Sequence, residues 1–182
     1  MSKLTTETCA TSPGLTDILC TRCGLCCDGS LFADVELAGP DETSGLELLG
    51  LDVEDADDDE GALLLLPCGA LRGKRCSIYP HRPDCCRTFE CRLLQQVKTG
   101  AVSLDRAKEK IAEALKRIEQ VKQLLVHWPQ GNARLPLKER CLEALALSVE
   151  SNDDQETNRK RTDLKIAMTS LENLLQKTFL GG

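Results

Sequence analysis

The sequence contains few aromatic residues, no excess of positive charge and no long apolar run. It has one Trp, one Tyr and three Phe among 182 residues, and its formal net charge is −6. The negative charge argues against general affinity for nucleic acid or anionic membranes, and the scarcity of aromatics argues against base stacking. The longest apolar stretch, Ala62–Leu66, is far too short to span a bilayer. We therefore expect neither a nucleic-acid partner nor a membrane partner.

Residues 1–19 also lack the basic start and the apolar run of a secretory signal. The expected location is therefore cytoplasmic, in a reducing compartment. Cysteines there are kept as thiols or held by metal rather than paired in disulfides. The eleven cysteines of the chain become its central feature for this reason.

The cysteines are concentrated in the first half of the chain. Ten of the eleven lie between Cys9 and Cys91, and only Cys141 lies beyond. This distribution predicts a Cys-rich metal-binding module over residues 1–100 and a helical extension over residues 101–182. The expected fold class is α+β, mostly α, with a small irregular module followed by a helical hairpin or three-helix extension.

Short elements are expected in the first module. Residues 31–37 alternate apolar and acidic side chains, as a half-buried strand does, and residues 41–49 suit a short amphipathic helix. Residues 62–66 suit a buried strand that ends at Pro67. Residues 52–60 form an acidic run that we interpret as a solvated loop, because the ligand spacing of a calcium loop is missing.

The second half has helical periodicity. Three amphipathic helices are predicted to begin at Leu104, near Pro136 and near Leu164. Ser103 is the expected N-cap of the first helix, and residues 151–161 are expected to be a polar linker. The apolar stripes are interpreted as a bundle core or as a surface for a protein partner or self-association through helices 103–179. Cys141 lies on such a stripe and is expected to be a buried structural thiol.

The first cysteine cluster has the spacing CxxCxxCC and consists of Cys20, Cys23, Cys26 and Cys27. A CxxC pair lets two sulfurs bind one ion while the intervening backbone N–H groups point at them. Gly24 can take the positive φ that such a loop often needs. Because adjacent side chains diverge in extended backbone, one of Cys26 and Cys27 is expected to face a second metal or a second layer of the site.

The second cluster combines cysteines with cationic side chains. Its cysteines are Cys68, Cys76, Cys85, Cys86 and Cys91. Between Arg72 and Arg92 there are six Lys or Arg against two acidic residues. A four-thiolate site with Zn²⁺ or a [4Fe–4S]²⁺ core carries about −2, which guanidinium groups would offset. Arg82 and Arg87 are therefore candidate cofactor-binding residues, and Tyr79 either donates its hydroxyl to a sulfur or packs under the loop.

The two clusters together form a longer pattern that resembles the YkgJ-like CxxCxxCC cysteine-cluster family. The pattern reads Cys-x2-Cys-Gly-x-Cys-Cys, Pro-Cys, Cys-x-Ile-Tyr and Arg-Pro-x2-Cys-Arg-x-Phe-x-Cys. It covers roughly residues 18–92, the core of the first module. The resemblance implies a zinc- or iron-chelating domain, often labelled Fe–S oxidoreductase, with some flagellin lysine methylases among its relatives. The ligands that it implies are Cys20, Cys23, Cys26, Cys27, Cys68, Cys76, Cys86 and Cys91.

Other residues are weaker ligand candidates. The family pattern does not require Cys85, and Cys9 lies outside it. His81 is an alternative imidazole ligand, but eight thiolates already suffice for two four-coordinate sites. Two alternatives remain. A set of plain structural thiols fits the CxxCxxCC spacing poorly, and a disulfide framework fits a reducing compartment poorly.

Three functions are compatible with the sequence. The first is a metal-binding protein that coordinates zinc or an iron–sulfur cluster, with a redox or maturation role. The second is a structural zinc module with a helical partner-docking surface and no catalysis. The third is an iron-dependent oxidoreductase or peptide-modifying enzyme. No catalytic triad, phosphate loop, dinucleotide fingerprint or S-adenosylmethionine motif is present, so catalytic residues stay unassigned.

Overall fold

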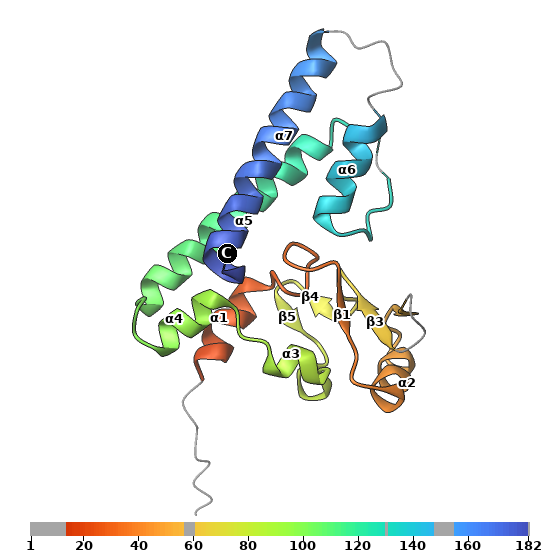
Figure 1. The fold of residues 1–182 in the computed structure, drawn as a ribbon, viewed down its shortest axis with the longest axis vertical. Helices are drawn as coiled ribbons and strands as arrows, with labels where there is room; N and C mark the ends of the chain where they lie inside the picture. The colour runs from red at the N-terminus through yellow and green to blue at the C-terminus, as the bar shows by residue number, and fades with distance from the viewer. Residues whose placement is uncertain (1–13, 57–60, 130, 148–154, 182) are drawn as a thin grey trace, which may run out of the picture.

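Short elements make up the cysteine-rich half of the chain, and long helices make up the second half (Figure 1). The computed structural model describes residues 14–56, 61–129, 131–147 and 155–181. The first half contains the helices α1 (Leu15–Cys23), α2 (Pro40–Leu48), α3 (Asp84–Thr88) and α4 (Arg92–Lys98), and the 3-10 turn η1 (Tyr79–His81). Its strands are β1 (Asp34–Glu36), β2 (Val53–Asp55), β3 (Ala62–Leu65), β4 (Leu71–Arg72) and β5 (Arg75–Cys76). The second half contains α5 (Leu104–Leu125), α6 (Leu137–Leu147), α7 (Gln155–Leu175) and the π-helical turn η2 (Gln176–Leu180). The expected fold class, α+β and mostly α, is confirmed.

Two small antiparallel sheets organise the first half. The three-stranded sheet has the order β1-β3-β2, and β4 and β5 form a separate hairpin. The expected strand over residues 31–37 is shorter in the structure, because only residues 34–36 pair with β3. The interpretation of residues 52–60 as a loop is wrong for Val53–Asp55, since this segment pairs with β3 on its other edge. Residues 57–60 lie outside the described part.

The helices of the second half pack in the way that their apolar stripes predict. Helices α5 and α7 lie side by side over much of their length, and α6 packs against both (Figure 1). The Ser103 side chain accepts a hydrogen bond from the backbone N–H of Arg106, which confirms the expected N-cap. The predicted linker over residues 151–161 is wrong from Gln155 onward, because α7 begins there. Its first turns are polar helix formers that project beyond the buried stripe.

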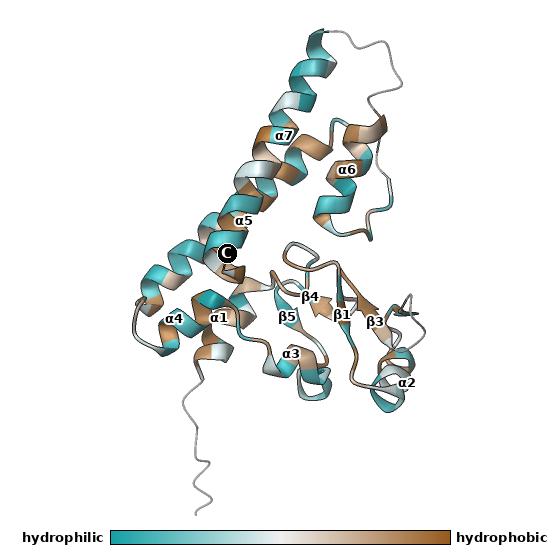
Figure 2. Cartoon of the chain, viewed as in Figure 1, coloured by the Kyte–Doolittle hydropathy of each residue, from teal (hydrophilic) through white to brown (hydrophobic). Residues whose placement is uncertain are grey.

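The buried apolar residues form two separate clusters. The larger core contains the inward faces of α5, α6 and α7 and also Leu19, Leu25, Leu93 and Leu94 from the first half. The smaller core lies between the three-stranded sheet, α2 and the β4–β5 hairpin, and consists of Leu37, Leu46, Leu51, Leu64 and Ala70. Figure 2 shows the hydrophobic strand β3 near a largely hydrophilic α2. The two cores flank the region in which the cysteines lie.

The two halves are in direct contact. Helix α1 packs against both α4 and α5, and the backbone N–H of Leu137 donates to the carbonyl oxygen of Gly29 at 3.3 Å. Gly29 has a φ of 74° and approaches Pro136 so closely that an added Cβ would lie 3.1 Å from the Pro136 Cα. The division into modules 1–100 and 101–182 stays a prediction, and the larger core is shared across that boundary.

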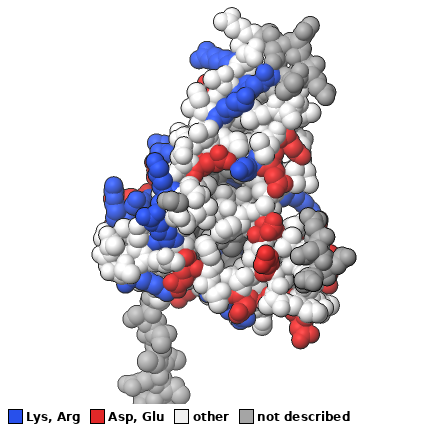
Figure 3. Space-filling view, viewed as in Figure 1, with Lys and Arg blue, Asp and Glu red and all other residues white. Residues whose placement is uncertain are grey.

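Charge is unevenly distributed on the face that Figure 3 shows. Asp and Glu gather over the strands of the first half, and Lys and Arg gather mainly over the helices. Within the described ranges, no helix combines the length and the apolar character that crossing a membrane requires.

Candidate metal centre

One cavity of about 590 Å³ lies between the two cores. Sulfur-bearing side chains from α1, the following turn, the β4–β5 hairpin, α3 and the start of α4 line it. These side chains are Cys20, Cys23, Cys26, Cys27, Cys68, Cys76, Cys85, Cys86 and Cys91. The eight cysteines of the sequence-based ligand set are thus all brought to one cavity, together with Cys85.

Helix α1 and the N-terminus of α4 position the first set of sulfurs. Cys20 and Cys23 lie on the last turn of α1, which ends where Gly24 adopts a φ of 77° and donates its N–H to the Cys20 carbonyl. Cys91 is the N-cap residue of α4. The side chains of Cys20, Cys23 and Cys91 all pack against the larger core.

The β4–β5 hairpin and the segment before it position a second set. Cys76 pairs with Leu71 in the hairpin, and Cys68 donates its backbone N–H to the Cys27 carbonyl at 2.8 Å. Both Cys68 and Cys76 pack against the smaller core. Five of the nine cysteines that line the cavity are therefore supported by one core or the other.

Cys26 and Cys27 lie on the turn between the two sets. Burial raises the pKa of Cys26, and among the neighbouring thiols Cys23 raises it further. Burial likewise raises the pKa of Cys27 to about 11, but the thiols that add most to the shift are Cys68 and Cys76. The two adjacent thiols therefore differ in their main thiol neighbours, and the expectation that one of them faces a second metal or a second layer of the site stays a prediction.

Cys86 belongs with the second set. Burial raises its pKa, and the nearby thiols that raise it further are Cys85, Cys27 and Cys68. Cys85 also shares a side-chain hydrogen bond with Cys86. Packing thus places Cys20, Cys23 and Cys91 at the larger core and Cys68 and Cys76 at the smaller core, and Cys86 has Cys85, Cys27 and Cys68 as its nearby thiols.

Without a cation, the cavity favours neutral thiols. Burial raises the pKa of Cys23 to about 12, and burial also raises the pKa of Cys20 and Cys91. Each thiolate would sit in a weakly polar cavity near other thiolates, which disfavours the charged form. A bound cation reverses this preference, because it attracts the thiolate and displaces the proton.

Backbone N–H groups act on the sulfurs in the opposite direction. The Ala70 N–H donates to the Cys68 sulfur at 3.4 Å. Backbone hydrogen bonds from Leu25 lower the pKa of Cys23, and those from Leu93 and Leu94 lower that of Cys91. Such donors stabilise thiolates around zinc and iron–sulfur centres.

The sulfurs surround the cavity without forming a ready-made coordination shell. Across residues 14–56, 61–129, 131–147 and 155–181, no three His, Cys, Asp or Glu side chains are arranged as a metal-binding group. The ten described cysteines are free thiols. Zinc–sulfur bonds are about 2.3 Å long, so binding requires the Cys side chains to turn inward. Free sulfur donors around one cavity have the right chemistry for a thiolate-bound metal. The coordination shell would form when the ion binds and the side chains turn toward it.

The cationic candidates lie at the cavity wall. Arg82, Arg87 and Tyr79 are among the residues that line it. The Arg82 guanidinium stacks on the Tyr79 ring, 3.6 Å from the ring centroid, and its Nε donates to the Tyr79 carbonyl. Tyr79 in turn donates its hydroxyl to the Asp17 carboxylate at 2.8 Å rather than to a sulfur, and its ring supports Arg82.

Arg82 and Arg87 differ in their surroundings. Arg82 is close enough to Cys20 to lower the pKa of that thiol against the larger effect of burial. Arg87 is exposed and lies 3.8 Å from the Asp84 carboxylate. Arg82 is therefore the better placed of the two to offset charge on the sulfurs.

Residues outside the expected ligand set differ in whether they line the cavity. His81 is exposed and is not part of the cavity lining, Cys141 is buried in the larger core, and Cys9 lies outside the described residues. Lys74 and Phe179 line the cavity, although neither is a candidate in the sequence. Lys74 belongs to the basic segment between Arg72 and Arg92, whereas nothing in the sequence connects Phe179 to the cysteines.

The comparisons with known proteins give one match. A family model described as "CxxCxxCC: Putative zinc- or iron-chelating domain" matches residues 19–123. No curated protein and no solved structure matches the chain. The matched segment covers more than half of the sequence and includes all eight candidate ligands. The chain therefore belongs to the CxxCxxCC family, whose described role is the chelation of zinc or iron.

Proposed function

We propose that this protein holds metal in two adjacent four-thiolate groups. The first group consists of Cys20, Cys23, Cys26 and Cys91. The second group consists of Cys27, Cys68, Cys76 and Cys86. The observation that carries the proposal is the cavity lined by all eight side chains. Three members of the first group, Cys20, Cys23 and Cys91, pack against the larger core, and Cys68 and Cys76 of the second pack against the smaller core.

The metal would cross-link segments that are distant in the sequence and already pack against one another. The first group links α1 to the start of α4, and the second links the turn after α1 to the β4–β5 hairpin and α3. Because each ion replaces several missing apolar contacts, metal binding would supply much of the folding free energy of this half. The backbone donors to Cys23, Cys68 and Cys91 would hold the thiolate form.

Arg82 would act as the nearest fixed countercharge of the first group. Its stacking on Tyr79 and the hydrogen bond of Tyr79 to Asp17 hold the guanidinium in place. A four-thiolate zinc or cubane site keeps about two negative charges, so a cation near Cys20 lowers the cost of burying it. Arg82 is a positioning and charge-balancing residue in this proposal, not a ligand.

Zinc and iron–sulfur are the two candidate forms of the centre. Closed tetrahedral zinc needs only the four sulfurs of each group. The volume of the cavity, about 590 Å³, and the N–H donors to sulfur favour iron–sulfur as a second candidate with a redox or maturation role, because these donors tune cluster potentials. Absorbance near 400 nm in anaerobically purified protein would indicate iron–sulfur, whereas colourless protein with zinc would exclude it.

Replacing one cysteine in each group tests the proposal. Cys23→Ser and Cys76→Ser should each remove about half of the bound metal, because each removes one of four ligands from one group. Cys141→Ala is the matched control, since its thiol is buried in the larger core, and it should keep the full metal content. Metal content unchanged by both serine substitutions, measured by elemental analysis of the full chain, would refute the assignment.

A further inference from the structure

The last turn of the chain reaches the cavity. Helix α7 does not end as an α-helix but widens into the π-helical turn η2, closed by a hydrogen bond from the Gly181 N–H to the Gln176 carbonyl at 2.8 Å. Within this turn Thr178 is 6% exposed and Phe179 is 1% exposed. Phe179 is one of the residues that line the cysteine cavity. A π-helical turn is rare and is often found at functional sites.

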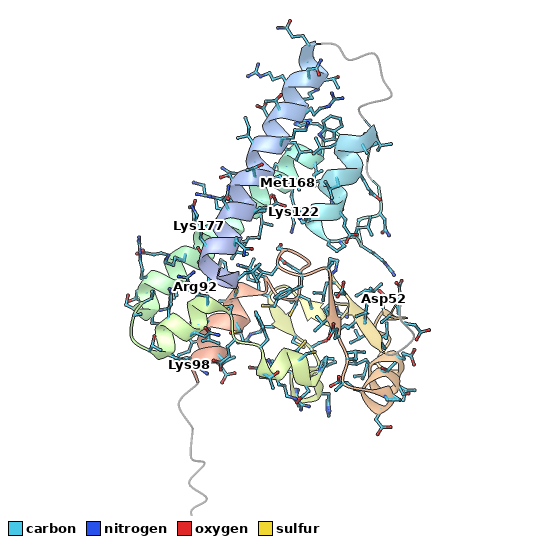
Figure 4. All side chains as sticks on the ribbon, in the orientation of Figure 1. Asp52, Arg92, Lys98, Lys122, Met168 and Lys177 are labelled. Carbon is cyan, nitrogen blue, oxygen red and sulfur yellow. The ribbon has the colours of Figure 1, made fainter. Side chains whose placement is uncertain are left out.

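The position of this turn is fixed against the first thiolate group. Turn η2 packs on α4, the helix that begins immediately after Cys91. Gly181 lies against Arg92, with 3.3 Å between an added Cβ and the Arg92 Cδ. Arg92 and Lys177, both labelled in Figure 4, mark the place where α4 meets the end of the chain. Phe179 belongs to the larger core, against which Cys20, Cys23 and Cys91 also pack.

This segment lies far outside the part of the chain that matches the family, which ends at residue 123. It therefore adds to the family site a wall that comes from another part of the molecule. An apolar side chain at such a place excludes water from the sulfurs, and water access governs how readily thiolates exchange metal or react.

We propose that Phe179 closes the cavity over the first thiolate group, so that the C-terminal turn sets how fast metal leaves Cys20, Cys23, Cys26 and Cys91. The part of this inference that concerns metal release rests on the proposed function. The same wall should shield the three neighbouring thiols that pack against the larger core even when no metal is bound. Phe179 is thus a positioning residue that acts through the solvent access of the ligands.

The test compares Phe179→Ala with Phe179→Leu and with the control Leu180→Ala, whose side chain is 38% exposed. In metal-loaded protein, Phe179→Ala should release about half of its metal to a chelator roughly tenfold faster than the unmodified chain. Phe179→Leu should restore slow release, because it keeps an apolar wall, and Leu180→Ala should not differ from the unmodified chain. Equal release rates for all four proteins would overturn the proposal.

A second measurement separates this inference from the proposed function. In metal-free protein, alkylation followed by mass spectrometry should show faster modification of Cys20, Cys23 and Cys91 in Phe179→Ala, with Cys68 and Cys76 unchanged. Faster modification of all five thiols would mean general loss of structure and would overturn the inference. Selective alkylation without any metal binding would refute the proposed function while upholding the role of Phe179 as a wall.

Discussion

The two halves of the molecule are stabilised in different ways. The larger core contains eighteen buried residues among those that the structure describes, most of them from the helical half, whereas the smaller core of the cysteine-rich half contains five. Burial of apolar surface stabilises by about 25 cal/mol per Å², so the helical half can be stable through its core. The cysteine-rich half encloses a cavity lined by thiols instead. In the proposed function, inorganic ions would take the place of a large core there.

Metal removal should give the largest effect and should fall on one half. A chelator should destabilise the cysteine-rich half by on the order of 10 kcal/mol, the scale of structural zinc sites, while most helical circular dichroism remains. Amide hydrogen exchange resolved along the chain measures both halves in one experiment. Equal loss of protection in α5 and α7 would contradict the difference between the halves and the two-module division.

The buried thiol of Cys141 in the helical half should stay protonated in the folded protein, whereas the proposed ligands in the cavity would lose their protons when metal binds. Burial raises the pKa of Cys141 from 9.0 to about 11, so the folded state keeps a proton that the unfolded state loses. Its contribution is therefore present below pH 9 and is lost as the pH rises toward 11, by up to about 2–3 kcal/mol at 1.36 kcal/mol per unit. Chemical denaturation at several pH values should show a shallower alkaline loss of stability in Cys141→Ala. Identical alkaline slopes in both proteins would show that Cys141 is not held in its neutral form by burial.

The contact between the halves can be tested at Gly29. Gly29→Ala adds a Cβ at 3.1 Å from Pro136 and 3.3 Å from Pro67, at a φ of 74°. The combined crowding and left-handed strain should cost roughly 1–3 kcal/mol. Gly73→Ala is a matched control, because Gly73 also has positive φ but meets no atom within 4 Å. Equal destabilisation of the two variants in urea would mean that only the backbone strain matters and that the contact adds nothing.

The smallest expected effect is confined to the helical half. Ser103→Ala removes the N-cap acceptor of α5 and should cost about 1 kcal/mol. Metal content should stay unchanged, because Ser103 lies outside the cavity lining. Ser103→Asp should recover the lost stability, and a drop in metal content in Ser103→Ala would show closer coupling between the halves than the structure suggests.

The sequence predicts the helices and the ligand types, because both leave local signals. The heptad pattern locates α5, and the spacing of the first cluster identifies Cys20, Cys23, Cys26 and Cys27 as ligand candidates. Residues 155–161 carry no apolar stripe, so their helical structure depends on the packing of the rest of α7 and cannot be read locally.

The arrangement of the site depends on contacts between distant segments. The convergence of the two cysteine clusters depends on the placement of α1 against β5, which the spacing alone does not specify. Phe179 reaches the cavity only because α7 runs back along α5 to α4. The role of helices 103–179 in binding a protein partner or a second copy stays a prediction, as does the location of the protein in the cell.

Native mass spectrometry of the full chain, purified without oxygen or chelators, tests the central claim most directly. Its mass should exceed that of the denatured chain by two zinc ions or by the iron and sulfide of two clusters, with the bound thiols deprotonated. A fully folded protein with the mass of the bare polypeptide would contradict the account, because the cavity would then hold nothing but thiols.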